Sequence, residues 1–161
     1  MKNNKGFSLV ELIIVIAIMA ILVGVMAPQL IKYIEKTNVS SDVQLCDTVR
    51  EAIQTAMMDP SVINASNPGI PASSATAHTA SFTSGGSAFD DAVIEILGTA
   101  TPGDQIKSSA KNNSGAVEYK VGSNSVLVYI TGSDDSGKKG TSVTGVTGSP
   151  ALIHAGDTTL Y

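Results

Sequence analysis

The chain begins with a long apolar stretch that no charged residue interrupts after its first turn. Residues 12–27 form a continuous apolar run, and the strongly polar side chains of residues 7–31 are only Ser8, Glu11 and Gln29. A helix rises about 1.5 Å per residue, so residues 12–31 span roughly 30 Å, the hydrocarbon thickness of a bilayer. The pattern predicts a membrane-spanning helix over residues 7–31.

Residues 32–59 continue this helix in amphipathic form. Apolar side chains recur at spacings of three and four, on one helical face: Val39, Val43, Cys46, Val49, Ile53 and Met57. We expect the polar residues of the opposite face to contact solvent or another chain: Asp42, Asp47, Arg50, Glu51 and Gln54. Pro60 ends the helix, because the residue before a proline disfavours helical conformation. The two halves together predict one helix of about 50 residues.

Residues 60–115 form a connector region with one short helix. Residues 60–87 are rich in small and hydroxyl side chains, and their plausible anchors to the domain are Val62, Ile63, Ile70 and Phe82. A helix is predicted over residues 88–97, with a capping box at Ser87–Asp90 and a C-terminal stop at Gly98. Its apolar side comprises Phe89, Val93, Ile96 and Leu97.

Residues 116–161 show strand-like alternation. In residues 116–121, Val117, Tyr119 and Val121 fall on one face, and Glu118 and Lys120 on the other. Residues 125–131 alternate similarly after a turn, and weaker strand signals follow at 141–147 and 151–154. The resulting prediction is an α+β fold with the helix first and the sheet last. Its long N-terminal helix packs on an antiparallel sheet of three or four strands.

Composition limits the possible functions. The 161 residues allow one small domain beyond the membrane helix. The net charge is −4 and Lys138–Lys139 is the one local basic pair outside the N-terminus, so we expect no nucleic-acid binding. Aromatic residues make up 4% and Trp is absent, which disfavours a continuous aromatic path for electrons. Cys46 is the only cysteine, so no intrachain disulfide forms, and its place in the apolar stripe predicts a buried, unreactive thiol.

Glu11 is the residue that breaks the apolar pattern. A charged acid costs about 2.5–3.5 kcal/mol at the centre of a membrane helix and less near its end, so an acid retained there is a candidate functional group. Lys2 and Lys5 precede the helix, which predicts a cytoplasmic N-terminus and an exported domain. The alternatives are a cleaved secretory signal peptide and a plain signal anchor. The best signal-peptide cleavage position, after Ala27, is obstructed by Pro28.

This N-terminal segment resembles the class III signal of type IV pilins and type II secretion pseudopilins. Those families share a short basic leader ending in Gly, then Phe, then an apolar helix with Glu four residues on. Gly6, Phe7 and Glu11 match these positions, and Pro28 lies where many members have a helix-distorting proline. The match covers roughly residues 1–35. The missing disulfide departs from many Gram-negative pilins.

The resemblance implies a maturation and assembly route. A prepilin peptidase would remove residues 1–6 by cutting between Gly6 and Phe7, and Phe7 would commonly be N-methylated. Glu11 would then neutralise the terminal amine of a neighbouring subunit. Loss of the two leader lysines changes the net charge from −4 to about −6. Pro28 lacks an N–H and loosens the helix near Gly24, either as a tolerated kink or as a stretch that extends on assembly.

The implied protein is the precursor of a type IV pilus subunit, which is a structural protein without enzymatic activity or cofactor. Its expected partners are copies of itself in a homopolymeric filament, prepilin peptidase, the inner-membrane assembly platform, and the membrane before assembly. It would reside in the cell membrane and then in a surface pilus, whose roles in the family include adhesion and motility. Two alternatives remain: a pseudopilin of a type II secretion system, and a membrane-anchored extracellular binding domain that never polymerises.

Other candidate sites are weak. Asp134 and Asp135 lie in a polar loop and are marginal calcium candidates, because calcium needs six to eight oxygen ligands and the spacing does not match an EF-hand. An ordinary hairpin turn is the competing interpretation. His78 and His154 have no neighbours at metal-ligand spacing, and we expect both at the surface.

Overall fold

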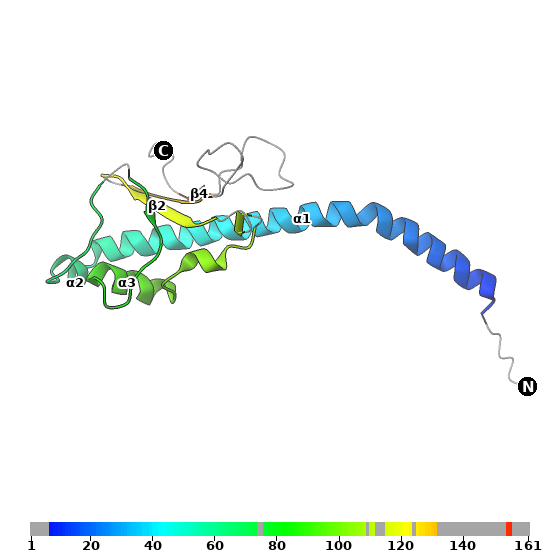
Figure 1. The fold of residues 1–161 in the computed structure, drawn as a ribbon, viewed down its shortest axis with the longest axis horizontal. Helices are drawn as coiled ribbons and strands as arrows, with labels where there is room; N and C mark the ends of the chain where they lie inside the picture. Colours follow the sequence, from blue (N-terminus) through cyan, green and yellow to red (C-terminus); the bar gives the residue numbers. More distant parts are fainter. Residues whose placement is uncertain are drawn as a thin grey trace, which may run out of the picture. The chain divides into compact units, whose positions relative to one another are not determined.

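The computed structural model describes residues 7–73, 76–108, 110–111, 115–123 and 125–131, together with the backbone of residues 154–155. The chain divides into two compact units, residues 1–34 and residues 35–161. The elements, labelled in Figure 1, are α1 (Leu9–Met58), α2 (Pro60–Ile63), β1 (His78–Thr79), α3 (Ala88–Leu97), η1 (Pro102–Gln105), β2 (Val117–Val121), β3 (Val126–Ile130) and β4 (His154–Ala155). The α+β prediction is confirmed.

Helix α1 is continuous over 50 residues and ends at Met58, as the sequence predicts. Pro60 does more than end it, because it occupies the first turn of the short helix α2. There a missing N–H costs nothing. Asp59 caps α2 by accepting a hydrogen bond from the backbone N–H of Ser61 at 2.7 Å. Hydrogen bonding from the side chain and the backbone of Ser61 lowers the pKa of the Asp59 carboxyl.

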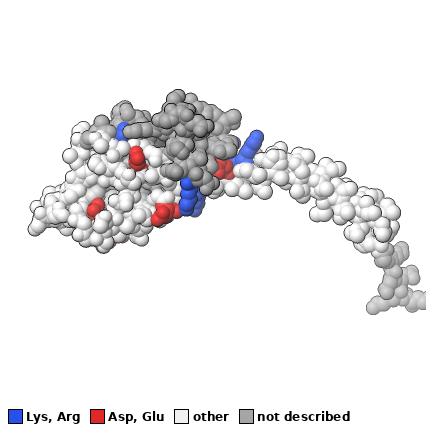
Figure 2. Space-filling view, viewed as in Figure 1, with Lys and Arg blue, Asp and Glu red and all other residues white. Residues whose placement is uncertain are grey.

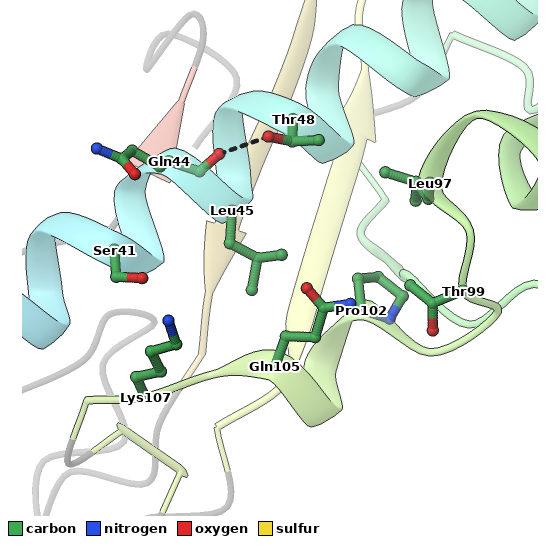
Figure 3. A pocket seen from close by; sticks show the side chains of 9 residues that line it. All are labelled: Ser41, Gln44, Leu45, Thr48, Leu97, Thr99, Pro102, Gln105 and Lys107. Atoms are coloured by element: carbon green, nitrogen blue, oxygen red, sulfur yellow. Dashed lines mark hydrogen bonds between the residues drawn. The ribbon is translucent and has the colours of Figure 1, made fainter.

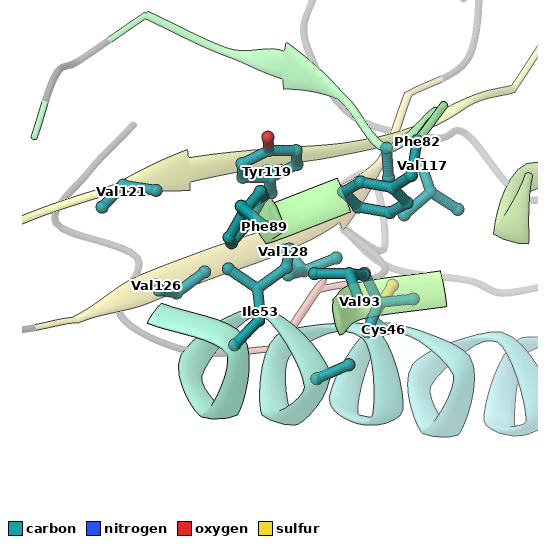
Figure 4. Close-up of a cluster of buried hydrophobic side chains, with 14 of the residues drawn as sticks. Cys46, Ile53, Phe82, Phe89, Val93, Val117, Tyr119, Val121, Val126 and Val128 are labelled. Atoms are coloured by element: carbon teal, nitrogen blue, oxygen red, sulfur yellow. The ribbon is translucent and has the colours of Figure 1, made fainter. Parts of the chain in front are cut away.

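The apolar stripe of the second half of α1 forms one side of the hydrophobic core. Its fully buried members are Cys46, Val49, Ala52, Ile53 and Ala56. Figure 4 shows Cys46 and Ile53 facing side chains of α3 and of the sheet. Val39, Val43 and Met57 are partly buried at its edges. The predicted packing of this face on the sheet is therefore confirmed.

Asp42 corrects the prediction for the polar face. It was expected to contact solvent or another chain, but it is only 1% exposed. Its position four residues before Cys46 places it on the buried stripe. Both carboxylate oxygens accept backbone hydrogen bonds, from the N–H of Lys107 at 2.8 Å and from that of Ser108 at 3.0 Å. These two hydrogen bonds replace the hydration that the carboxylate loses when it is buried.

The sheet has the strand order β1-β2-β3-β4, with every neighbouring pair antiparallel. In the central pair Val117 lies opposite Ile130 and Val121 opposite Val126, which confirms the predicted strands. These four residues are all buried, which confirms their inward faces. The strand β1 comes from the connector and pairs His78 with Tyr119. The expectation that all strands follow the helices is therefore wrong for β1. Residues 141–147 and 151–153, where weaker strands were predicted, lie outside the described residues.

An aromatic row joins the connector to the core. The His78 ring stacks on Tyr119 with centroids 5.4 Å apart, and Tyr119 stacks on Phe82 at 6.2 Å. Phe82 meets Phe89 of α3 edge to face, also at 6.2 Å. His78 is thus half-buried and in contact with Tyr119, which corrects its assignment as an isolated surface residue. Figure 4 shows Phe82, Phe89 and Tyr119 together above α1.

The second face of β2 and β3 is also largely buried. Lys120 is only 4% exposed, and its Nζ lies 6.0 Å from the centroid of the Tyr129 ring. The Tyr129 hydroxyl donates a 2.8 Å hydrogen bond to Glu118. Burial and this carboxylate raise the pKa of Tyr129. Leu127 is also fully buried, so both faces of β3 pack against other parts of the molecule.

Helix α3 follows its predicted limits. The Ser87 hydroxyl accepts a hydrogen bond from the backbone N–H of Asp90 at 3.1 Å, and Gly98 ends the helix in the left-handed conformation at φ 68°. Phe89 and Val93 are buried as predicted, but Ile96 is 48% exposed.

Two of the four expected connector anchors, Val62 and Phe82, are buried. Ile70 is half-buried against the core. Ile63 is about half exposed, so it does not anchor the connector.

Candidate functional site

The first unit is an apolar helix whose described side chains are all exposed. Every residue from Phe7 to Ile34 is exposed. Phe7 retains 85% of its accessible surface. By length and composition, α1 contains a segment long and apolar enough to cross a membrane. In the face shown in Figure 2, which is viewed as in Figure 1, the N-terminal part of α1 shows no Lys, Arg, Asp or Glu.

Glu11 lies in the first turn of α1 and caps it. Its carboxylate accepts a 2.8 Å hydrogen bond from the backbone N–H of Ser8. Glu11 lies three positions after Ser8 and reaches back to its backbone N–H, which is one half of a capping box. A negative charge is also favourable at a helix N-terminus. The prediction for Glu11 missed this contact, although the Ser8-Leu9-Val10-Glu11 spacing could have revealed it.

The charge on Glu11 has no basic side chain near it among the described residues. Residues 7–31 contain no Lys or Arg, and the first one along α1 is Lys32. At 1.5 Å per residue, Lys32 lies roughly 30 Å further along the helix. The Ser8 N–H satisfies one carboxylate oxygen but does not neutralise the charge.

Phe7 lies two positions before Leu9, the first residue of α1, whereas Gly6 and the rest of residues 1–6 lie outside the described part. The structure places Phe7 and Glu11 at the same end of α1, four residues apart. An amine at Phe7 and a carboxylate at Glu11 would therefore lie about 6 Å apart along the helix axis, roughly one turn. In two parallel helices side by side, an axial shift of about one turn would bring the amine of one level with the carboxylate of the other.

Gly24 and Pro28 lie inside a continuous α1. Because Pro28 has no N–H, the carbonyl of Gly24 lacks the helical hydrogen bond that would normally reach it. An added Cβ at Gly24 would meet no heavy atom within 4 Å. Beside Pro28 runs a shallow, largely apolar groove of about 400 Å³, lined by Val23, Met26, Ala27, Gln29, Leu30 and Tyr33. The missing hydrogen bond at the Gly24 carbonyl therefore lies in a part of the helix whose apolar surface is exposed.

Chemistry elsewhere in the described residues is limited. Cys46 is fully buried, and burial together with the nearby Asp42 and Asp47 carboxylates raises its pKa to about 12. The thiolate is thus suppressed at neutral pH, in agreement with an unreactive thiol. Within the described ranges, no group of three or more His, Cys, Asp or Glu side chains is arranged to hold a metal. The calcium candidates Asp134 and Asp135 lie outside those ranges.

Known proteins are similar to this chain in its N-terminal region. The family model of the prokaryotic N-terminal methylation motif matches residues 1–27. A type IV major fimbrial protein, FimA of Dichelobacter nodosus, is 42% identical over 56 residues, which are 35% of this chain and 36% of that protein. Over this N-terminal region the chain is similar to type IV fimbrial proteins.

A fimbrial protein of Pseudomonas aeruginosa is similar to the chain as well. It is 37% identical over 59 residues, 37% of this chain and 38% of that protein. The chain thus matches little more than a third of the length of these fimbrial relatives. No solved structure matches the chain significantly. The likeness to type IV pilins therefore comes from the N-terminal motif, these short matches and the α+β architecture.

Proposed function

We propose that the chain is the precursor of a structural subunit of a type IV pilus. The observation that carries the proposal is the segment of residues 7–34, which contains the first part of α1, is exposed throughout and almost wholly apolar, and carries a single acid near its beginning. Contiguous apolar surface of this extent marks a site of contact with lipid or with another protein. A pilus subunit uses both contacts in turn, with the membrane before assembly and with other subunits afterwards.

Maturation accounts for the first residues. A prepilin peptidase would cleave between Gly6 and Phe7, release the leader of residues 1–6, and leave an N-methylated Phe7 as the new terminus. The match to the N-terminal methylation motif over residues 1–27 supports this step. Lys2 and Lys5 would hold the leader at the cytoplasmic face before cleavage. Residues 35–161 would then be the exported domain.

Assembly gives the Glu11 charge a partner. In a filament of parallel helices, the Phe7 amine of one subunit would pair with the Glu11 carboxylate of the next. Attraction between charges strengthens in low dielectric, and desolvation offsets part of it. An unpaired carboxylate among apolar helices is penalised, so the pair fixes the axial position at which a subunit docks. The missing hydrogen bond at Gly24 would let the helix extend near Pro28 during this transfer.

Mass spectrometry of the N-terminus tests the proposal. Filaments sheared from cells and the remaining membranes would be digested and analysed separately. We expect chains that begin at N-methylated Phe7 in the sheared fraction. A Gly6→Ala variant should retain residues 1–6 and should not appear in sheared material.

Other outcomes would point to the alternatives. Processed Phe7 found only in membranes would favour a pseudopilin that acts beneath the surface. An intact Met1 in all material, as expected for an anchored binding domain, would rule out a pilus subunit. A start after Ala27 would indicate a secretory signal peptide instead.

A further inference from the structure

The buried Asp42 joins two parts of the second unit that are far apart in the sequence. Its carboxylate accepts backbone hydrogen bonds from Lys107 and Ser108, which lie 65 and 66 positions further along the chain. We call residues 99–108, which follow α3 and include η1, the strap. Hydrogen bonds to an ionised acceptor are stronger than those to a neutral one. Asp42 is therefore a strong polar contact between α1 and the strap.

The strap is held together by bonds of its own. The Thr101 hydroxyl donates to Asp104 at 2.6 Å, and the backbone N–H groups of Asp104 and Ile106 bond within the turn of η1. Lys111 Nζ braces the same turn by donating to the Asp104 carbonyl at 2.9 Å. These bonds do not require α1, so the strap can keep its local conformation if it separates from the helix.

Few side chains attach the strap to the rest of the unit. Only Pro102, Ile106 and Ser108 of its residues are buried. At its beginning the Ala100 carbonyl accepts a hydrogen bond from the Phe82 N–H at 2.9 Å. Segments with few buried apolar contacts open locally at a lower free energy than the core.

A groove already separates part of the strap from α1. It has a volume of about 200 Å³, and Figure 3 shows Leu45 of α1 directed toward Gln105 and Pro102 across it. Lys107 of the strap points toward Ser41 at one end. The two surfaces thus lie side by side without close packing along this line, so the closed arrangement depends on the few contacts described above.

We propose that the strap opens as a unit from α1 and that Asp42 is the latch that holds it closed. When the strap is closed, the Asp42 carboxylate is shielded from water and each of its oxygens accepts a hydrogen bond from the strap. When the strap is open, water donates to the carboxylate in place of the two N–H groups. The carboxylate therefore keeps its hydrogen bonds, and the net free-energy cost of opening stays modest. Opening would uncover the buried part of the α1 face around Asp42. This proposal does not depend on filament formation.

Hydrogen exchange of the unmodified full chain in detergent micelles gives the first test. We expect the amides of Lys107 and Ser108 to exchange through an opening that depends weakly on urea, whereas the β2 and β3 amides exchange only through unfolding with a steep dependence. If all these amides share one opening free energy and one urea dependence, the strap does not open separately and the proposal is wrong.

Substitution of the latch gives the second test. Asp42→Asn removes the charge and one acceptor at nearly constant shape. It should speed exchange at Lys107 and Ser108 by at least about tenfold and leave β2 and β3 within about twofold. The matched control is Asp47→Asn, which removes the same charge from a half-exposed acid of α1 that pairs with Arg50 at 3.5 Å. The control should leave strap exchange unchanged.

Two results of the substitution would contradict the latch. Unchanged exchange at Lys107 and Ser108 would show that Asp42 does not hold the strap. If exchange accelerated equally at every amide, Asp42 would stabilise the whole unit and would not hold the strap specifically. If Asp42→Asn does not fold, the urea series on the unmodified chain still decides whether the strap opens alone.

Discussion

Glu11 combines two properties that belong to different states of the chain. As a hydrogen-bond acceptor it caps its own helix through the Ser8 N–H at 2.8 Å. As a charge it lies roughly 30 Å along the helix from the nearest basic residue of α1. The first property needs only an oxygen, whereas the proposed pairing between subunits needs a negative charge. Substitution can therefore separate the two roles.

Glu11→Gln should abolish filament assembly while preserving the cap. The amide oxygen still accepts from Ser8, but it cannot neutralise a neighbouring Phe7 amine. Glu11→Ala loses both properties and should destabilise the first turn by about 1 kcal/mol as well. The measurement is the amount of subunit in sheared filaments, normalised to processed subunit in membranes.

The control for this pair is cleavage at Gly6–Phe7, which should persist in both variants. If Glu11→Gln assembles normally and only Glu11→Ala fails, capping rather than charge is the function of Glu11. If both assemble normally, the proposed pairing is wrong.

Single residues were the hardest features to foresee from the sequence. The periodicity identified the buried positions Cys46, Val49 and Ile53 because repeated apolar spacing reports directly on a helix face. It misplaced Asp42, whose partners are backbone N–H groups of the distant strap. No side-chain pattern encodes such a contact. For Lys120, alternation gave the face of the strand, but alternation does not say whether that second face is covered.

At the scale of elements, the ends of helices and the positions of strands were predicted more accurately than the surroundings of single residues, because local sequence determines them. The ends of α1 and α3 follow from Pro60, Ser87 and Gly98, and β2 and β3 follow from alternation on both sides of a tight turn. Strand β1 has only two residues and no apolar alternation, so it exists because β2 offers an edge. Such an element cannot be recognised before its partner is placed.

Gly98→Ala tests the C-terminal cap of α3. Gly98 has φ 68°, and an added Cβ would meet nothing within 4 Å, so only the backbone conformation is penalised. The free energy of unfolding should fall by about 1 kcal/mol. Urea unfolding of the full chain in detergent, followed by far-UV circular dichroism, measures it.

The matched control is Gly103→Ala, because Gly103 does not have a positive φ and its added Cβ would make only an ordinary contact at 3.8 Å. This variant should change the free energy of unfolding by less than about 0.5 kcal/mol. Equal losses in the two variants would mean that the left-handed conformation at Gly98 is not the cause.

At the scale of the whole molecule, the second unit buries several groups that ionise only in alkali. Cys46 and Tyr119 both have pKa values raised to about 12, from 9.0 and 10.0, and burial is the main cause in each. The pKa of Tyr129 is raised as well. Each group therefore holds its proton more tightly in the folded chain than in the unfolded chain.

Stability should consequently fall as pH rises. Between about pH 9 and 12 the unfolded chain loses these protons before the folded chain does, so the free energy of unfolding decreases through this window and is unaffected below it. Urea unfolding at a series of pH values measures the effect. Tyr119→Phe keeps the ring and removes the hydroxyl, so it should make the decline shallower. A free energy of unfolding that stays constant up to pH 11 would contradict the prediction.

The position of the single cysteine also has a practical consequence for imaging. Because the only native thiol is buried and protonated, a maleimide dye should leave the folded protein unlabelled at neutral pH. A cysteine introduced at an exposed position such as Ser84 would then be the sole reactive site on each copy. One dye per subunit at a known residue would allow the movement and turnover of the protein to be followed on living cells, without first removing a native residue from the core.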